Sequence, residues 1–179
     1  LCPLLIKKLD ERKAYILLSV YGFAASIFSF VIGHFWFQSP DNMVLTVLFY
    51  ASLFLIGLQF GAVTLMPMIM TADCVDYYEY ETGKRVEGAA YSILTLTIKV
   101  CLALGTAVGL IFVQVSGYYD ALGAGTFTTK TKDIIFFAYT ALPGVLALLS
   151  IFPMFKYDIV GEKKAQISAT LSQRRAGKE

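Results

Sequence analysis

Charged residues are scarce in this chain and absent from long stretches of it. Asp, Glu, Lys and Arg make up 16% of the residues and hydrophobic residues 57%, whereas soluble domains carry about 25% charged residues. Residues 14–37, 43–70 and 134–155 contain none of the four, and 88–116 contains only Lys99. Each stretch exceeds the roughly 20 residues with which an α-helix crosses a bilayer. Too little polar sequence remains to cover four such helices in water, so we predict an all-α membrane protein with four transmembrane helices.

Cysteine and histidine are scarce as well. The 3 cysteines, Cys2, Cys74 and Cys101, have neither a pairing pattern nor metal-ligand spacing, and the 1 histidine, His34, lies among apolar and aromatic residues. We interpret His34 as a side chain at the membrane interface in preference to a proton relay. The sequence also lacks a P-loop, a nucleophile elbow and a basic patch interleaved with aromatic residues. An enzyme, a metal site, a bound cofactor and a nucleic-acid partner are therefore not expected.

Basic residues indicate how the chain is oriented. All but three of the 15 lysines and arginines lie before the first span, between the second and third, or after the fourth. Cytoplasmic loops are enriched in Lys and Arg, so we expect these segments, the C-terminus included, on the cytoplasmic side of a plasma (bacterial inner) membrane. The opposite side holds a short turn at 38–42 and a Gly- and Thr-rich loop at 119–132, which we expect to be mobile.

The segments outside the spans complete the expected organisation. Residues 1–6 are apolar but too few to cross a bilayer, so we expect 1–13 to be the end of a preceding helix and a basic cytoplasmic loop. The chain is then the C-terminal part of a longer protein, with 14–155 in the membrane. For the tail 156–179, whose Ala165, Ile167 and Leu171 have helical spacing, we expect a short surface helix or disorder.

Small residues and one proline give signals about helix packing. The pairs Gly57/Gly61 and Gly105/Gly109 lie one helical turn apart, a spacing that lets a second helix approach closely. We interpret them as packing sites, with a hinge as the alternative. Pro67 lacks a backbone N–H and is predicted to bend the second span.

One face of the third span carries its polar side chains. Spacings of three and four residues place the following residues on one side of the helix: Gly88, Ser92, Thr95, Lys99, Ala103 and Thr106. A lysine at mid-membrane costs about 2.5–3.5 kcal/mol on insertion scales, so Lys99 must face a wet path, a bundle interior or a counter-charge. We interpret Lys99, Ser92, Thr95 and Thr106 as a transport or coupling site, with a structural ion pair as the alternative. The other spans hold no carboxylate, so any partner of Lys99 is expected outside this chain.

A dense acidic segment, 73–87, separates the second and third spans. Its carboxylates are Asp73, Asp76, Glu79, Glu81 and Glu87, and they accompany Lys84 and Arg85. The spacing matches no calcium loop, and no histidine accompanies it. We interpret the segment as a gate or an inter-helix ion-pair network at the cytoplasmic side, with a solvated loop as the alternative.

The same segment resembles a known family of carriers. The residues that carry the resemblance are Ala72-Asp73-Cys74-Val75-Asp76-Tyr77-Tyr78-Glu79, then Thr82-Gly83-Lys84-Arg85 and Glu87-Gly88, with Tyr91-Ser92 and Lys99 after them. They are similar to the glycoside–pentoside–hexuronide:cation symporters, the melibiose-carrier branch of the major facilitator superfamily. Tyr78 stands where the family usually has a small residue, and no tryptophan stands near Thr64, where melibiose carriers have one.

The resemblance implies a fold and a function. The four spans would be helices nine to twelve of a twelve-helix carrier, in which two bundles rock around a central site and couple sodium or proton entry to sugar uptake. Its N-terminal bundle, lipid and a sugar or glycoside would be the partners, and Lys99 would lie near the coupling site. Asp73, Asp76, Glu79, Arg85 and Glu87 would form the cytoplasmic gate.

Two other hypotheses stay open. The first is a carrier of the same fold with a non-sugar substrate, such as a lysolipid or an organic anion. The second is a tetraspan structural membrane protein.

Overall fold

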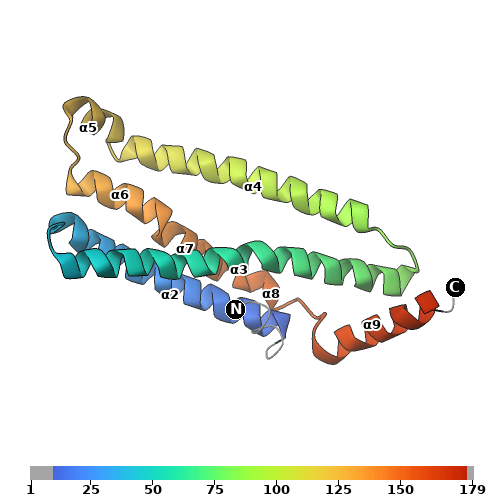
Figure 1. The fold of residues 1–179 in the computed structure, drawn as a ribbon. Helices are drawn as coiled ribbons and strands as arrows, with labels where there is room; N and C mark the ends of the chain where they lie inside the picture. Colours follow the sequence, from blue (N-terminus) through green and yellow to red (C-terminus); the bar gives the residue numbers. More distant parts are fainter. Residues whose placement is uncertain (1–9, 177–179) are drawn as a thin grey trace.

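The computed structural model describes residues 10–176, and the side chains of all of these except Ala62 and Val63. The helices in chain order are α2 (Glu11–Gln38), α3 (Met43–Thr82), α4 (Glu87–Val115), α5 (Tyr118–Ala124), α6 (Thr129–Tyr139), α7 (Ala141–Leu149), α8 (Ile151–Met154) and α9 (Gly161–Ala176). Figure 1 shows α2 and α3 packed with α6–α8, while α4 diverges from α3 and α9 lies at one end. Cys2, the predicted helix end and much of the predicted basic loop lie in 1–9, outside the described residues.

Four stretches of helix are long and apolar enough to cross a membrane. They are Glu11–Gln38, Met43–Thr82, Glu87–Val115 and Thr129–Met154, with mean hydropathies of 2.1, 2.1, 2.2 and 2.2. In a regular helix the backbone polar groups between the ends are bonded within the helix, as the bilayer interior requires. The predicted all-α membrane fold with four spans is confirmed.

The second span is much longer than expected. α3 has 40 residues, so it is about 60 Å long and exceeds the ~30 Å hydrocarbon core. It ends at Gly83, which has a φ of 70° and donates its N–H to the carbonyl of Glu79 at 2.8 Å. The predicted end of this span at residue 70 is therefore wrong, because 71–82 continues the helix and does not form a loop. α3 also runs through Pro67 without interruption.

The fourth span is divided, contrary to the single helix expected at 134–155. It begins at Thr129 and is interrupted at Thr140 and at Ser150. A proline ring clashes with the carbonyl four residues before it and gives that carbonyl no N–H. Pro143 and Pro153 stand four residues after Tyr139 and Leu149, the residues at which α6 and α7 end. The two prolines account for the positions of both interruptions.

Glycines allow α2 to approach its neighbours closely. A Cβ atom at Gly33 would collide with the ring of Phe136 in α6, and one at Gly22 would collide with the side-chain amide of Gln59 in α3. At Gly144 in α7 the added atom would lie 2.6 Å from the Cβ of Ser26. The sequence does not single out these three glycines, since they lack the paired spacing of Gly57/Gly61 and Gly105/Gly109.

The glycine pairs that do have that spacing contact no other helix. An added Cβ at Gly57, Gly61, Gly105 or Gly109 meets nothing within 4 Å. In the described part of the chain, these pairs therefore do not serve as packing sites between its own helices.

Aromatic rings fill the end of the bundle near α5, called here the α5 end. The rings of Trp36 and Phe49 stack with their centroids 4.5 Å apart, and the centroid of the Phe136 ring lies 5.6 Å from that of Phe49. The α2–α3 turn is fixed by Asn42, whose side chain accepts from the N–H of Val44 at 3.1 Å and caps α3. Stacked rings contribute about 0.5–1.5 kcal/mol beyond their buried area, so this cluster holds α2, α3 and α6 together.

The segment 119–132 is largely helical, whereas its composition led us to expect a loop. It contains α5 and the start of α6, where the Thr128 side chain caps the helix by accepting from the N–H of Thr131. The hydroxyl of Thr131 donates to the carbonyl of Ser116 at 3.0 Å, a buried bond that ties the segment to the end of α4.

His34 has polar partners at the α5 end. Its Nδ1 lies 2.9 Å from Asp133 Oδ2, and Gln38 Nε2 lies 2.9 Å from its Nε2. Asp133 belongs to α6, within the fourth span as observed. The expectation that the other spans hold no carboxylate is therefore wrong, because this span begins earlier than predicted.

We expect Gly33→Ala to destabilise the protein, because the Phe136 ring against it is itself held by Phe49 and cannot move freely. Overpacking of this kind costs about 1–3 kcal/mol in the free energy of unfolding. The measurement is denaturant unfolding in detergent micelles. Gly105→Ala is the matched control, since its added methyl enters open space. Equal stability of both variants would contradict the close α2–α6 contact.

Candidate functional site

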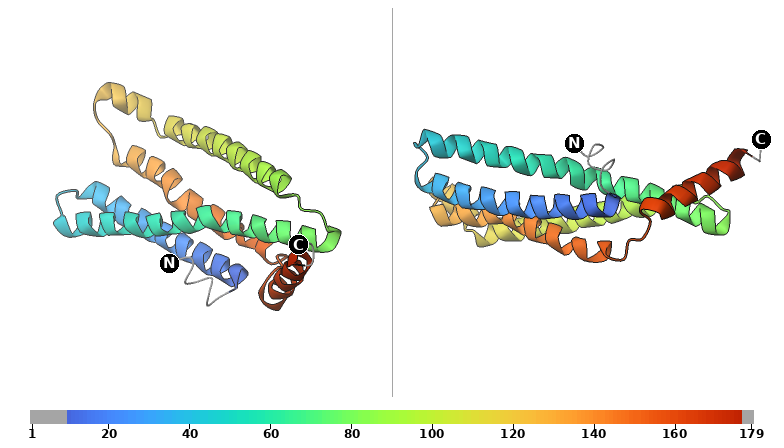
Figure 2. Two further views of the ribbon diagram at one scale, coloured as in Figure 1. Left: turned by 45° about the vertical axis from the view of Figure 1, so that its right-hand side comes forward. Right: turned by 90° about the horizontal axis from the view of Figure 1, so that it is seen from below.

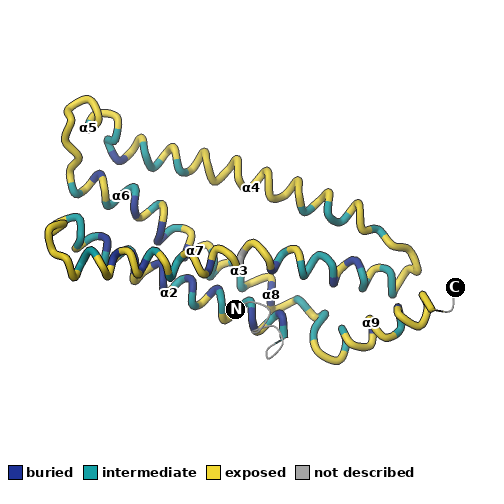
Figure 3. The backbone as a smooth tube through the Cα atoms, viewed as in Figure 1, coloured by how far each residue is buried: buried dark blue, intermediate teal, exposed yellow. Residues whose placement is uncertain are grey.

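The helix that carries Lys99 is the least covered of the four spans. None of the residues of α4 is buried, and Figure 3 shows it exposed along nearly its whole length. The left view of Figure 2 shows α4 standing apart from α2. Its contacts lie towards its ends, where Tyr91 donates to the carbonyl of Met68 at 3.5 Å and Phe112 lies 6.2 Å from Phe137.

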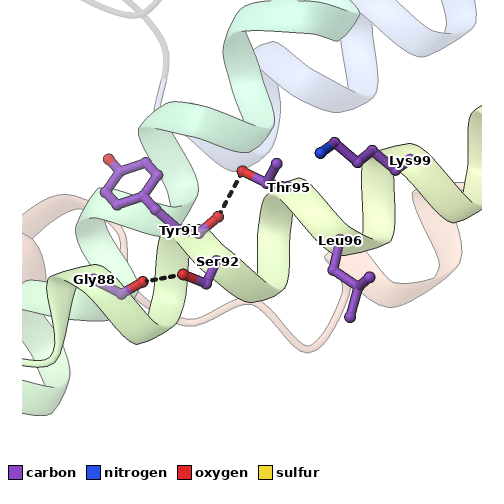
Figure 4. A pocket seen from close by; sticks show the side chains of 6 residues that line it. All are labelled: Gly88, Tyr91, Ser92, Thr95, Leu96 and Lys99. Atoms are coloured by element: carbon purple, nitrogen blue, oxygen red, sulfur yellow. Dashed lines mark hydrogen bonds between the residues drawn. The ribbon is translucent and has the colours of Figure 1, made fainter.

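A shallow, open pocket of about 420 Å³ lies on the polar face of α4. Its lining residues are Gly88, Tyr91, Ser92, Thr95, Leu96 and Lys99. Figure 4 shows the Thr95 hydroxyl and the Lys99 amine on the same side of the helix. The structure thus brings together Ser92, Thr95 and Lys99. Thr106, the fourth predicted residue, lies about 10 Å farther along the helix and does not line the pocket.

The hydroxyls of this face donate to their own helix. Ser92 donates to the carbonyl of Gly88 at 2.7 Å and Thr95 to that of Tyr91 at 2.8 Å. Each oxygen keeps lone pairs that can accept a hydrogen bond from a ligand. Among residues 10–176 Lys99 forms no ion pair, so its ammonium offers three donors to the pocket. The pocket can therefore bind hydroxyl groups or an anionic group.

At the opposite end of the bundle, called here the α9 end, one lysine joins three segments. Lys164 of α9 lies 2.7 Å from Glu11 Oε1 of α2 and 2.7 Å from Asp73 Oδ1 of α3. Tyr157 donates to Asp73 Oδ2 at 3.1 Å. We call these four residues the Lys164 cluster. Both carboxylates belong to buried residues, so the lysine is their main compensating charge.

The environment of the Lys164 cluster shifts two pKa values. Burial alone would lower the pKa of Lys164, but its hydrogen bonds to Asp73 and Glu11 outweigh burial and raise it above the usual value. The pKa of Tyr157 is also raised, first by burial and then by the negative charge of Asp73. Lys164 is therefore charged and Tyr157 neutral at physiological pH, which is the combination that two carboxylates require.

A second group of charges, the Arg85 cluster, joins α3 to the start of α4 and to α9. Arg85 lies 2.9 Å from both Glu79 and Glu87 and 3.3 Å from Asp76. Arg175 of α9 approaches Glu79 to 2.8 Å and Asp76 to 3.6 Å. The hydrogen bonds to Glu87 and Glu79 raise the pKa of Arg85. Except for Glu79, these side chains are more exposed than those of the Lys164 cluster, so each pair contributes little by itself.

The five predicted gate residues fall into these two clusters. Asp73 belongs to the first, and Asp76, Glu79, Arg85 and Glu87 belong to the second. Sequence reasoning missed their partners on α9. The contacts join residues as far apart in the chain as Lys164 and Glu11, so no local pattern reveals them. The helical spacing of Ile167 and Leu171 was the available signal, and both side chains are buried.

Comparison with known proteins assigns the chain to a family. Residues 1–161 match the family described as MFS/sugar transport protein. The chain belongs to this family. Its members are transporters, in agreement with the prediction that the protein is not an enzyme, and the expected relationship to the major facilitator sugar symporters is confirmed.

Several proteins that are similar to this chain are named as symporters or carriers. Inner membrane symporter YicJ of Escherichia coli K12 is 31% identical over 60% of the chain and 23% of its own length. Symporter YjmB of Bacillus subtilis is 26% identical over 96% of the chain and 35% of its own length. The glucuronide carrier protein homolog of E. coli K12 is 28% identical over 59% of the chain and 22% of its own length. The chain thus spans at most about a third of these relatives. No solved structure is significantly similar to it.

Replacing Lys164 should release α9 from the bundle. Lys164→Gln leaves Glu11 and Asp73 without their cation; breaking a fully buried pair in this way costs about 3–5 kcal/mol, and the cost here is smaller because the Lys164 side chain is 35% exposed. We expect backbone amide exchange in α9 to become about tenfold faster or more, measured by hydrogen–deuterium exchange and mass spectrometry. Lys156→Gln is the matched control, since Lys156 is exposed and forms no ion pair within 10–176. Unchanged exchange in Lys164→Gln would show that Ile167 and Leu171 alone hold the helix.

Proposed function

We propose that the chain forms the C-terminal part of a carrier that moves a sugar or glycoside together with sodium or a proton. The observation that carries this proposal is the Lys99 pocket, where a lone intramembrane charge and two hydroxyl oxygens share one open face. An intramembrane lysine points to a substrate or ion path. Two relatives named as symporters and one named as a glucuronide carrier support a coupled carrier, and the family description supports a sugar.

In this proposal the exposed face of α4 completes the substrate path with the rest of a carrier of the relatives' size. Hydroxyl groups of a sugar would donate to the free lone pairs of Ser92 and Thr95. The Lys99 ammonium would pair with a carboxylate of the other bundle, or give way to the transported cation. The coupling ion thus needs no resident metal or cofactor on this chain.

The α9 end is proposed to be the cytoplasmic end, in a bacterial inner membrane. Most lysines and arginines outside the spans lie at this end, as the positive-inside rule requires. The name of one relative, an inner membrane symporter, agrees with the membrane assigned. The Arg85 cluster would then open and close on the cytoplasmic side as the carrier alternates between its two states.

Lys99 can be tested in the carrier that contains this chain, reconstituted into vesicles with imposed sodium or proton gradients. We expect Lys99→Ala to lower gradient-driven glycoside uptake about tenfold or more, the effect of losing a hydrogen bond to a charged group. Lys130→Ala, which removes a lysine at the α5 end, should leave uptake unchanged. Gradient dependence equal to wild type in Lys99→Ala would make the lysine structural. If no glycoside is taken up but a lysolipid or an organic anion is, the substrate is not a sugar and the non-sugar hypothesis is favoured.

The gate can be tested by comparing neighbouring cations. Arg85→Gln removes three ion pairs, and we expect the maximal uptake rate to change about fivefold while the substrate KM changes little. The reason is that these pairs bias the balance between two states and do not touch the substrate. Lys84→Gln is the matched control, because Lys84 forms no ion pair among the described residues. Equal maximal uptake rates in the two variants would indicate that the turn containing Lys84 and Arg85 is merely solvated and has no role as a gate.

A further inference from the structure

A hydrogen-bonded pair of titratable side chains joins α2 to α6 at the α5 end. His34 Nδ1 lies 2.9 Å from Asp133 Oδ2, and this is the one hydrogen bond between side chains of the two helices within 10–176. His34 lies one turn before the end of α2, and Asp133 lies one turn after the start of α6. Each is therefore about 6 Å from the end of its helix, next to the exposed turn 39–42 and not deep in the membrane.

The partners of the imidazole ring determine which of its nitrogens carries the proton. The amide nitrogen of Gln38 is a donor and lies 2.9 Å from His34 Nε2, so this ring nitrogen accepts. In a neutral imidazole the hydrogen then belongs to Nδ1, which donates to Asp133. The arrangement is therefore that of a neutral His34 with its proton on Nδ1.

The same partners can also serve the protonated ring. An imidazolium donates from both nitrogens, and Asp133 already accepts from Nδ1. Gln38 is exposed at the end of α2, where half a turn of its amide brings the amide oxygen to the place of the nitrogen. That oxygen accepts from Nε2–H. His34 can therefore gain or lose a proton without losing a hydrogen bond.

The carboxylate of Asp133 is incompletely satisfied. Its Oδ1 is enclosed by protein and has no hydrogen-bond partner, and it is the only such side-chain atom within 10–176. With a neutral His34 the pair carries one negative charge, whereas with one added proton it carries no net charge. Uptake of a proton thus converts an anion at this position into a neutral ion pair.

Few other charges lie near the pair. α3 and α7, which also pack against α2, hold no Asp, Glu, Lys or Arg within 43–72 and 141–149. Apart from tyrosines, the other titratable side chains at this end are Asp41, Asp120, Lys130 and Lys132. None of the described residues except His34 forms an ion pair with Asp133, and Lys132 Nζ lies over the Phe37 ring, 5.9 Å from its centroid. The proton of the pair itself is therefore the main charge that changes here.

α6 connects the pair to α4. Next to the pair, the contacts between α2 and α6 are apolar, since Phe136 packs against Gly33 and the Phe137 ring meets that of Phe30. Thr131, two residues before Asp133, donates to the carbonyl of Ser116 at the end of α4. α6 is thus held between α2 and α4, and the His34–Asp133 contact determines how firmly it is attached to α2.

We propose that His34 and Asp133 form a proton-binding site that fastens α6 to α2 when the pH at the α5 end falls. A proton from solvent adds to Nε2 as the Gln38 amide turns, and the bond from Nδ1 to Asp133 then joins opposite charges and becomes stronger. Imidazole changes its charge between about pH 5 and 8, so the site responds in the physiological range. It does not depend on the proposed sugar transport, and only its place on the outer side rests on the proposed orientation.

The first test locates the proton by solid-state NMR of the carrier that contains this chain, in lipid vesicles and with nitrogen-labelled histidine. The signals of His34 are those that disappear in His34→Gln. We expect the proton on Nδ1 alone at about pH 8 and protons on both nitrogens at about pH 5. A proton on Nε2 alone at the higher pH, or a ring that is still neutral at the lower pH, would overturn the proposal.

The second test measures how firmly α6 is held, by hydrogen–deuterium exchange at about pH 5 and about pH 8. After correction for the intrinsic effect of pH on exchange, α6 should exchange about fivefold more slowly at the lower pH, the effect of one partly exposed ion pair. His34→Gln and Asp133→Asn keep polar groups at both positions but cannot form the ion pair, so each should abolish the difference.

The matched control is Asp120→Asn, which removes another carboxylate at the α5 end. Asp120 is exposed and forms no ion pair among the described residues, so this variant should keep the difference between the two pH values. A difference that persists in both His34→Gln and Asp133→Asn would assign the effect to other groups. Equal exchange of α6 at the two pH values in the unaltered carrier would show that the pair does not fasten the helix.

Discussion

The membrane interior cannot accept or donate hydrogen bonds, and every feature of this structure follows from how the chain meets that constraint. Backbone groups are satisfied within long helices, and hydroxyls such as Ser92 and Thr95 donate to their own helix. Most charges are confined to the ends, where they pair with each other. Lys99 and Gln59 depart from this pattern, and they are therefore the positions at which a ligand or another helix is expected.

The α9 end shows how charge organises a bundle that has little buried surface of its own. Glu11 of α2 and Asp73 of α3 are buried carboxylates, and their negative charges would repel each other. Lys164 of α9 pairs with both carboxylates and so holds α9 against α2 and α3. The Arg85 cluster, by contrast, is exposed and shares its carboxylates between two arginines. One cluster is thus suited to hold α9 permanently, whereas the other can break and re-form at a small energetic cost.

The sequence was sufficient for features that arise locally. Runs without charge predict the spans, and the three- and four-residue spacing of Ser92, Thr95 and Lys99 predicts their common face, which the structure shows. It was insufficient where distant residues decide the outcome. The interruptions at Thr140 and Ser150 could have been derived from Pro143 and Pro153, but the docking of α9 and the close approach at Gly33 depend on partners from other parts of the chain. Charge and composition alone could not distinguish a loop at 73–82 from a protruding helix.

The polar face of α4 can be reached only from a polar medium. The Lys99 pocket carries a cation and free hydroxyl lone pairs, which only a polar ligand can satisfy, so a wet path must reach it for it to function. A second cavity, between α2, α3, α6 and α7, is lined by Ser19, Ser26 and Gln59 among others and by no residue of α4. Because α3 contacts α4 and also lines this cavity, a change in the position of α3 would alter both the cavity and the polar face of α4.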